Sequence, residues 1–355
     1  MPNRHRRPEP VLTYACHGCA TTGQAATRLI HPVSRRTLLR GMAGLALAAR
    51  YAPAAAQSLG PAFSYPMGIS GQALGDGLIV RHGYACENTI VQTGWLHTAE
   101  DWYRTNGAET GGSRVYTVGA GEVVFAGYDY PGLVVIVEHA PDLFSMYGHL
   151  DYAVAVELGQ VVDRGQLIGT VLTQIGRRVP SHLHFEMRNF FINPVVNGEN
   201  PSHGVHCGVN CPPGPGYWPT SAPEHPTAIG WRNPSHVING RAFAGGVPPR
   251  AEVVVAELAP AAVDLWSAPA TEPGAEVSGS LAVRPGERFR LLNVSAGPEA
   301  SAETSANGYQ VWYEIQFKVG ERTWVQAAVP SLTDTGADGR PSAVVLAFLP
   351  DVRSA

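Results

Sequence analysis

Charged side chains are scarce in this chain, and lysine is almost absent. Asp, Glu, Lys and Arg make up 15% of the 355 residues, and Lys318 is the single lysine. The formal net charge is −4, which gives no electrostatic support to a nucleic-acid partner. Hydrophobic residues reach 45%, so the composition also excludes a disordered chain. The length predicts about two domains.

Helical periodicity is missing from the central part of the chain. Turn formers are abundant instead, with 40 Gly and 29 Pro. Between them lie β-rich runs at 115–128, 133–140, 143–156, 166–172 and 182–188. Residues 57–194 therefore predict an all-β domain, an antiparallel β-sheet or barrel-sandwich.

The N-terminus is expected to be a targeting segment rather than part of the fold. A twin-arginine pair in SRRTLLR, residues 34–40, is followed by the apolar stretch GMAGLALAA and a run of alanines. Residues 1–56 are thus similar to a twin-arginine export signal with an N-terminal extension. The apolar stretch is too short to span a bilayer, so we expect no stable membrane span after signal removal. An amphipathic leader or an uncleaved anchor is the alternative.

Export would place the mature protein, beginning near Gln57, in the periplasm, the cell wall or the medium. Its remaining cysteines are Cys86, Cys207 and Cys211. An oxidising compartment favours a local disulfide between Cys207 and Cys211, although three cysteines permit three single bridges.

The C-terminal part of the chain divides into two stretches of different composition. Residues 195–250 are rich in Gly, Pro, Asn and His, and we expect a loop and linker without regular elements. Residues 251–355 contain five short β-rich runs and are similar to a small bacterial SH3-like β-barrel over about 260–330. An unrelated small barrel is the alternative. We expect an aromatic core there, formed by Trp266, Trp312, Tyr313 and Trp324.

The stretch SHLHFEMR, residues 181–188, carries the first chemical signal. In a strand, His182, His184 and Glu186 share one face, and the apolar residues between them take the other. Same-face neighbours are about 7 Å apart at the backbone, so two imidazoles there can converge on one small volume. An isolated pair of this kind also fits a half-exposed strand, so partners are needed.

Two other motifs supply those partners. GWLHTAEDWYR places His97 and Asp101 four residues apart, and SMYGHL places His149 in a β-rich run. A catalytic zinc ion takes three protein ligands and keeps one position for water, and imidazole and carboxylate are among its usual ligands.

The order HxxxD, YGH, HxH, with the hairpin VELGQVVDRGQLIGTV between the last two motifs, resembles the zinc peptidoglycan endopeptidases typified by lysostaphin. The resemblance covers about residues 94–194. It implies a single Zn²⁺ bound by His97, Asp101 and His184, with His149 and His182 as catalytic residues. It also implies hydrolysis of stem or cross-bridge peptides of peptidoglycan as the activity. Which of His149 and His182 is the general base stays open, as does the oligomeric state.

The remaining candidates have more than one interpretation. Glu186 is either an acceptor that orients an imidazole or a solvated carboxylate. His82 and His139 stand alone and are expected to be structural or on the surface. His203 and His206, beside Cys207 and Cys211, fit either a second metal site or a disulfide-closed loop. The residues that could line a substrate groove are His225 and His236.

Three other functions compete with this interpretation. A non-catalytic relative would bind cell wall or activate another hydrolase, but such relatives lose metal ligands, and all five positions are present here. The hairpin is also similar to biotinyl or lipoyl carriers, which need a lysine that residues 57–194 lack. Cupins use an HxH pair as well, but their glutamate lies farther along the chain.

Overall fold

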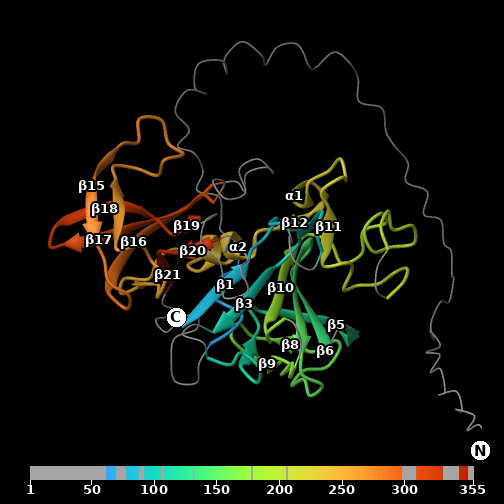
Figure 1. Cartoon of the computed structure of the whole chain (residues 1–355). Helices are drawn as coiled ribbons and strands as arrows, with labels where there is room; N and C mark the ends of the chain where they lie inside the picture. Colours follow the sequence, from blue (N-terminus) through green and yellow to red (C-terminus); the bar gives the residue numbers. More distant parts are fainter. Residues whose placement is uncertain are drawn as a thin grey trace, which may run out of the picture. The chain divides into compact units, whose positions relative to one another are not determined.

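The computed structural model describes residues 61–68, 77–87, 92–104, 108–130, 132–176, 179–204, 207–297, 309–330 and 344–350. The expected export signal and His206 lie outside the described residues. Strands dominate the described part, which confirms the predicted all-β class (Figure 1).

The first ten strands belong to the stretch predicted as the peptidase domain. They are β1 (Leu78–His82), β2 (Trp95–His97), β3 (Glu100–Arg104), β4 (Arg114–Tyr116), β5 (Gly121–Tyr130), β6 (Gly132–Ala140), β7 (Leu143–Leu150), β8 (Val161–Val162), β9 (Leu167–Thr170) and β10 (Leu183–Arg188). Seven of them form an antiparallel sheet in the order β1-β3-β10-β7-β6-β5-β8, and Figure 1 shows β1, β3 and β10 side by side. β4 and β9 pair with each other outside this sheet, and β2 also lies outside it.

Alternation in β10 sorts its side chains as the sequence predicts. Leu183, Phe185 and Met187 belong to the main hydrophobic core and are fully buried. His184 and Glu186, on the opposite face, are buried as well, at 3% and 0% exposure. Both faces of this strand are therefore covered, and the polar face is covered by the segment that follows it.

Residues 195–250 contain short regular elements, so the expectation of a loop without them was wrong. They are β11 (Tyr217–Pro219), α1 (Pro226–Ile229), β12 (Trp231–Arg232) and α2 (Pro234–Arg241). β11 pairs with β2, and β12 pairs with β10. These elements are too short for a periodic pattern. The start of α2 depends instead on the Asn233 side chain, which accepts from His236 N, and on proline at the first turn.

A disulfide joins Cys207 to Cys211, and Cys86 is a free cysteine. Next to the disulfide, the side-chain amide of Asn197 donates to the carbonyl oxygens of Phe191 and Cys211. The Asn197 side-chain oxygen accepts from the backbone of Asn193. The start of this segment is thus held by buried polar contacts rather than by a sheet.

The C-terminal strands are β13 (Glu252–Val255), β14 (Ala262–Trp266), β15 (Val277–Ala282), β16 (Arg288–Ala296), β17 (Val311–Lys318), β18 (Glu321–Gln326), β19 (Ala328–Pro330), β20 (Val344–Leu346) and β21 (Phe348–Pro350). Seven of them form a second antiparallel sheet in the order β15-β14-β18-β17-β16-β13-β21. All five runs predicted for this unit are strands, while its likeness to an SH3 domain stays a prediction.

The expected aromatic core of this unit is correct for two residues and wrong for two. Tyr313 and Trp312 are buried, at 0% and 4% exposure. Trp266 and Trp324 are only partly buried, and both line a surface pocket of about 390 Å³. In β14 and β18 the buried positions next to these indoles are Leu265 and Val325, so alternation turns Trp266 and Trp324 to the opposite face of the sheet.

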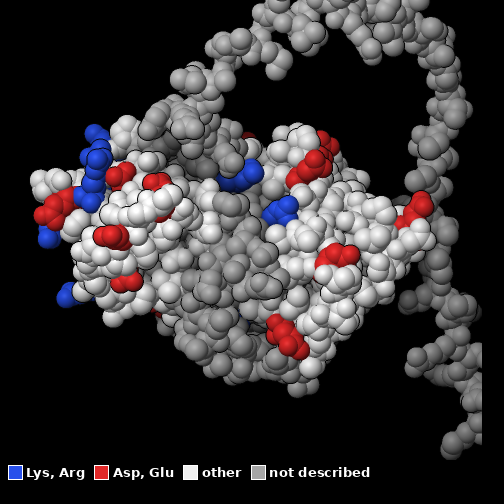
Figure 2. Space-filling model, turned by 90° about the horizontal axis from the view of Figure 1, so that it is seen from above, with Lys and Arg blue, Asp and Glu red and all other residues white. Residues whose placement is uncertain are grey.

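The surface matches the composition. On the face in Figure 2, acidic and basic side chains are dispersed among uncharged residues without a large patch of one sign. Among the described residues, no helix has the length and apolar character needed to cross a membrane.

Candidate metal centre

Three neighbouring strands place the core of the candidate site in one row. His184 in β10 is paired with Asp101 in β3, and Asp101 is paired on its other side with His82 in β1. Directly paired residues of an antiparallel sheet point to the same face with short Cβ separations. His97 ends β2, four residues before Asp101, and joins this row from outside the sheet.

The three predicted ligands bring one atom each to a common point. His97 Nε2 lies 3.2 Å from His184 Nδ1 and 3.4 Å from Asp101 Oδ1, and His184 Nδ1 lies 3.5 Å from the same oxygen. Tetrahedral zinc with bonds of about 2.0–2.1 Å requires ligand atoms about 3.3 Å apart. The three spacings therefore fit one face of a zinc tetrahedron, and the fourth corner is left for water or substrate.

Burial and charge at this point also fit a cation. The exposed fractions of His97, Asp101 and His184 are 0%, 2% and 3%, and among the described residues no donor reaches the buried Asp101 Oδ1 with the geometry of a normal hydrogen bond. Burial opposes the charge of Asp101, but His182 and His97 outweigh it and hold the pKa of Asp101 well below its usual range. The carboxylate is therefore ionised, and a metal ion would neutralise it.

The two imidazoles of the triad have opposite shifts. Burial is the main cause that lowers the pKa of His97 to about 3, against the attraction of Asp101. Burial acts in the same direction on His184, but hydrogen bonds and charges from Asp101 and Glu186 outweigh it and raise the pKa of His184 to about 9. Only neutral imidazole binds a metal, so His184 gives up its second proton when an ion binds.

Glu186 is a buried acceptor, and its interpretation as a solvated carboxylate was wrong. Its Oε1 accepts from His184 Nε2 at 3.2 Å and from Thr98 Oγ1 at 2.9 Å. Its Oε2 accepts from Trp231 Nε1 at 3.0 Å and lies 3.6 Å from Arg188 Nη1. Burial raises the pKa of Glu186, but these partners outweigh it and lower the pKa overall. The bond to Nε2 leaves His184 Nδ1 as the ligand atom.

His182 precedes β10 and faces the same carboxylate oxygen as the triad. Its Nδ1 donates to Pro180 O at 2.9 Å, and its Nε2 lies 3.5 Å from Asp101 Oδ1. The ring also stacks on Tyr103, with centroids 5.3 Å apart. In the neutral ring, the bond to Pro180 puts the lone pair on Nε2, the atom that faces the site.

His149 reaches the site through an irregularity in β7. Pairing with β6 shifts between Leu150 and Tyr147, and His149 has a φ of +60°. Such a bulge redirects a side chain. The ring lies 4.7 Å from that of His182 and 5.9 Å from that of His184. All five predicted site residues are therefore brought together, with roles that stay predictions.

His82 belongs to this cluster, and the interpretation that it could lie on the surface was wrong. Its exposed fraction is 2%, its Nδ1 lies 3.5 Å from Asp101 Oδ2, and its ring stacks on His97. His82, His97 and Asp101 also form a group that could hold a metal ion, because their ligand atoms lie within 4.8 Å of one another. The sequence carries only one signal for it, a histidine at the end of a β-rich run.

The other histidines within the described ranges have structural contacts. His139 bonds to Ala120 O and Ser145 Oγ, and His203 packs against Trp95 and Trp218. His225 caps α1, and His236 bonds to Gly297 O. The disulfide removes both sulfur atoms from a second metal site at Cys207 and Cys211.

Residues 96–200 match the family model described as peptidase family M23. This part of the chain is an M23 domain. All five predicted site residues fall inside the matched range, whereas His82 and Trp231 lie outside it. Among curated proteins, no sequence gives a significant match to this chain.

Several solved structures resemble parts of the chain. A zinc-containing peptidase from Vibrio cholerae is 27% identical over 36% of this chain and 36% of its own, with a TM-score of 0.28. Csd3 from Helicobacter pylori is 25% identical over 38% and 33%, with a TM-score of 0.26. Lysostaphin from Staphylococcus simulans is 15% identical over 78% and 95%, with a TM-score of 0.32. The match thus spans only about a third of the first two proteins, and the assignment to M23 rests on the family model.

Proposed function

We propose that this chain is an exported zinc metalloendopeptidase that cleaves stem or cross-bridge peptides of bacterial peptidoglycan. The observation that carries the proposal is the spacing of the donor atoms of His97, Asp101 and His184, with the Nε2 of His182 beside them. The match to M23, a family of zinc-dependent peptidases, supports the reaction type. Export through the signal of residues 1–56 belongs to the same proposal.

His182 is the better placed general base. A zinc ion held by the triad supplies Lewis acidity, lowering the pKa of a coordinated water and polarising the scissile carbonyl. His182 Nε2 accepts the proton of the attacking water, because Nδ1 is already committed to Pro180 O. The same proton is then available for the leaving amine.

His149 is assigned to the developing oxyanion. Its ring stands edge-on to that of His182 at 4.7 Å, on the strand next to β10. A protonated imidazole there donates a hydrogen bond where negative charge appears in the tetrahedral state.

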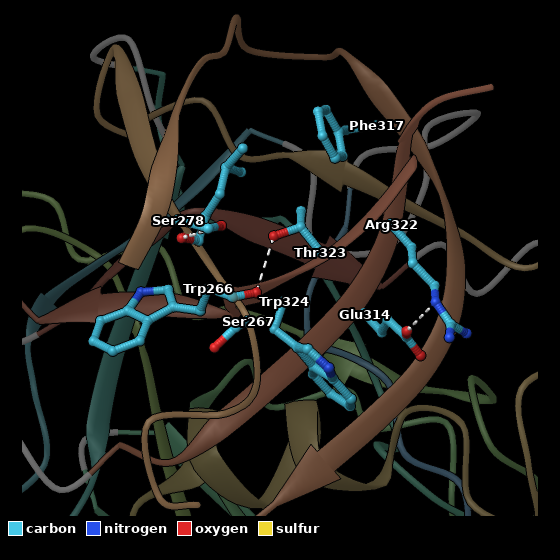
Figure 3. A pocket seen from close by; sticks show the side chains of 9 residues that line it. Trp266, Ser267, Ser278, Glu314, Phe317, Arg322, Thr323 and Trp324 are labelled. Atoms are coloured by element: carbon cyan, nitrogen blue, oxygen red, sulfur yellow. Dashed lines mark hydrogen bonds and ion pairs between the residues drawn. The ribbon is translucent and has the colours of Figure 1, made fainter. Parts of the chain in front are cut away.

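The C-terminal sheet is proposed to hold wall peptides near the M23 domain. This sheet has a pocket of about 390 Å³. Figure 3 shows its lining residues Trp266, Trp324 and Phe317 and the ion pair of Arg322 with Glu314. Aromatic faces beside paired charges suit a peptide with apolar and ionic groups. Trp266→Ala is expected to reduce co-sedimentation with purified walls and leave hydrolysis of a soluble peptide unchanged. Unchanged sedimentation would make this sheet a structural appendage.

Two variants test the catalytic proposal directly. His184→Ala is expected to lose both zinc and wall-clearing activity, because it removes a ligand. His182→Ala is expected to keep zinc and lose activity, because it removes the base only. Metal analysis of the purified proteins and release of free amines from peptidoglycan provide the measurements. Full activity of His182→Ala would contradict the assignment of the base.

The alternative is a non-catalytic relative that binds cell wall or activates another hydrolase. The same assay separates the two functions. Wild-type protein that contains zinc, binds walls and releases no amines would support the alternative. The intact set of five site residues favours the enzyme.

A further inference from the structure

His82 is a buried imidazole for which the proposed mechanism has no use. It is 2% exposed, and neither ring nitrogen makes a hydrogen bond within the described part of the chain. Its Nδ1 lies 3.5 Å from Asp101 Oδ2, the carboxylate oxygen that points away from the other two ligands. A buried polar group without a partner is costly, so this arrangement needs an explanation.

A β-bulge places His82 opposite Asp101. Val80 in β1 is paired with Trp102, and the next pair joins His82 to Asp101, so Arg81 is the extra residue. Without the bulge, Arg81 would pair with Asp101, and His82 would pair with Glu100, the preceding residue of β3. Bulges of this kind redirect side chains next to functional sites. Arg81 instead lies over the ring of Tyr103, 5.1 Å from its centroid.

The ring geometry argues against His82 as a fourth ligand. The rings of His82 and His97 are stacked with centroids 4.1 Å apart and an interplanar angle of 4°. An imidazole binds a metal through a lone pair that lies in its ring plane. Two parallel, stacked rings direct their lone pairs along separate planes, so one ion cannot meet both. His97 has the better claim, because its Nε2 is the atom that approaches both Asp101 and His184.

We propose that His82 is a positioning residue for the metal centre, an inference that rests on the proposed zinc site. Its Nδ1, 3.5 Å from Asp101 Oδ2, is the donor that would bond to this oxygen when Oδ1 turns toward an ion, which would make the carboxylate a one-oxygen ligand. Its ring face at the same time fixes the plane of His97. One side chain from β1, outside the residues matched to M23, thus holds two of the three ligands.

Matched substitutions of His82 separate the effect of its Nδ1–H donor on Asp101 from the effect of its ring on His97. His82→Phe keeps a ring to stack on His97 and removes the donor. His82→Asn removes the ring and keeps an amide N–H close to the position of Nδ1. Zinc affinity is measured by competition with a chromophoric chelator, and the visible spectrum of the cobalt-substituted protein reports the number of ligands. His139→Asn is the control, because it removes another histidine with two hydrogen bonds, away from the metal.

We expect His82→Phe to weaken zinc binding by about 10–100-fold, the usual effect of losing a group that orients a ligand. His82→Asn should recover most of that loss, His139→Asn should bind zinc as the wild type does, and all cobalt spectra should agree. Equal zinc affinity of His82→Phe and wild type would overturn the inference, as would equal weakening by both His82 variants. A changed cobalt spectrum in them would make His82 a ligand instead. Failure of the wild type to bind zinc would contradict the proposed function itself.

Discussion

At the scale of single residues, backbone conformation decides which side chains can reach the metal centre. His149 has a φ of +60°, a left-handed conformation that is uncommon outside glycine and is tolerated best by asparagine, aspartate and histidine. The residue sits in a bulge that turns its ring toward His182. Its role therefore depends on two properties, an imidazole and a backbone that tolerates positive φ.

The structure predicts different outcomes for two substitutions of His149. His149→Asn should fold with near wild-type stability, because asparagine accepts positive φ, and lose about 10²–10⁴-fold in the rate of peptide hydrolysis. His149→Val should also lose about 1–2 kcal/mol of unfolding free energy, because a branched side chain is strained there. Hydrolysis rates and urea unfolding curves provide the check. An active His149→Asn protein would exclude a catalytic role.

At the scale of elements, residues 195–240 complete the metal centre from outside the sheet. β11 pairs with β2, the strand that ends at His97, and Tyr217 packs on the His97 ring at 5.0 Å. β12 brings Trp231 to Glu186, which in turn holds His184. These contacts give the segment a supporting role that its composition did not indicate.

Trp231→Phe tests this support. The change keeps an aromatic ring in a fully buried position and removes the donor to Glu186 Oε2. We expect a loss of about 1–3 kcal/mol in unfolding free energy. Zinc binding should weaken by less than about tenfold, since Glu186 keeps its bond to His184. Trp312→Phe, at a buried indole in the second sheet, is the control and should leave zinc affinity unchanged. Weaker zinc binding in Trp312→Phe together with unchanged zinc binding in Trp231→Phe would contradict a role of Trp231 in supporting the metal centre.

At the scale of the whole molecule, buried neutral histidines make stability depend on pH. His236 in α2 is 7% exposed, and burial lowers its pKa to about 4, against the hydrogen bond to Gly297 O. The unfolded chain binds this proton near the ordinary pKa of 6.5, so only the unfolded state is protonated between these values. Stability therefore falls as pH decreases from 6.5 to 4, by at most about 3 kcal/mol from this residue.

Replacing His236 should flatten this dependence. We expect the unfolding free energy of His236→Gln to fall less steeply between pH 6.5 and pH 4 than that of the wild type. Denaturant unfolding at several pH values measures the two slopes. Val237→Ala in the same helix is the control, because it should lower stability equally at every pH. Parallel curves for His236→Gln and wild type would show that this imidazole does not contribute.

Local pattern was sufficient for much of the fold, since strand alternation predicted that Leu183 and Phe185 are in the core. The resemblance to a known family in motif order implied His97, Asp101 and His184 as ligands. The structure brings these three together, and their roles stay predictions. Local pattern was not sufficient to predict the place of His82, because the bulge at Arg81 that redirects the His82 side chain has no sequence signature. It also failed for α2, which is too short for a periodic pattern. The prediction for Trp266 was wrong because it followed the aromatic residue type, whereas alternation with the buried Leu265 turns Trp266 away from the core.

The sequence by itself determined the strand pattern, the all-β class and the set of donor groups. Each of these depends on neighbouring residues and the chemistry of their side chains. Only the tertiary structure decided that His82 lies against Asp101 and His97, that Glu186 bonds to Trp231, and which nitrogen of His182 faces the site. These facts depend on strand register, bulges and hydrogen bonds between residues far apart in the chain, and local pattern carries no information about them.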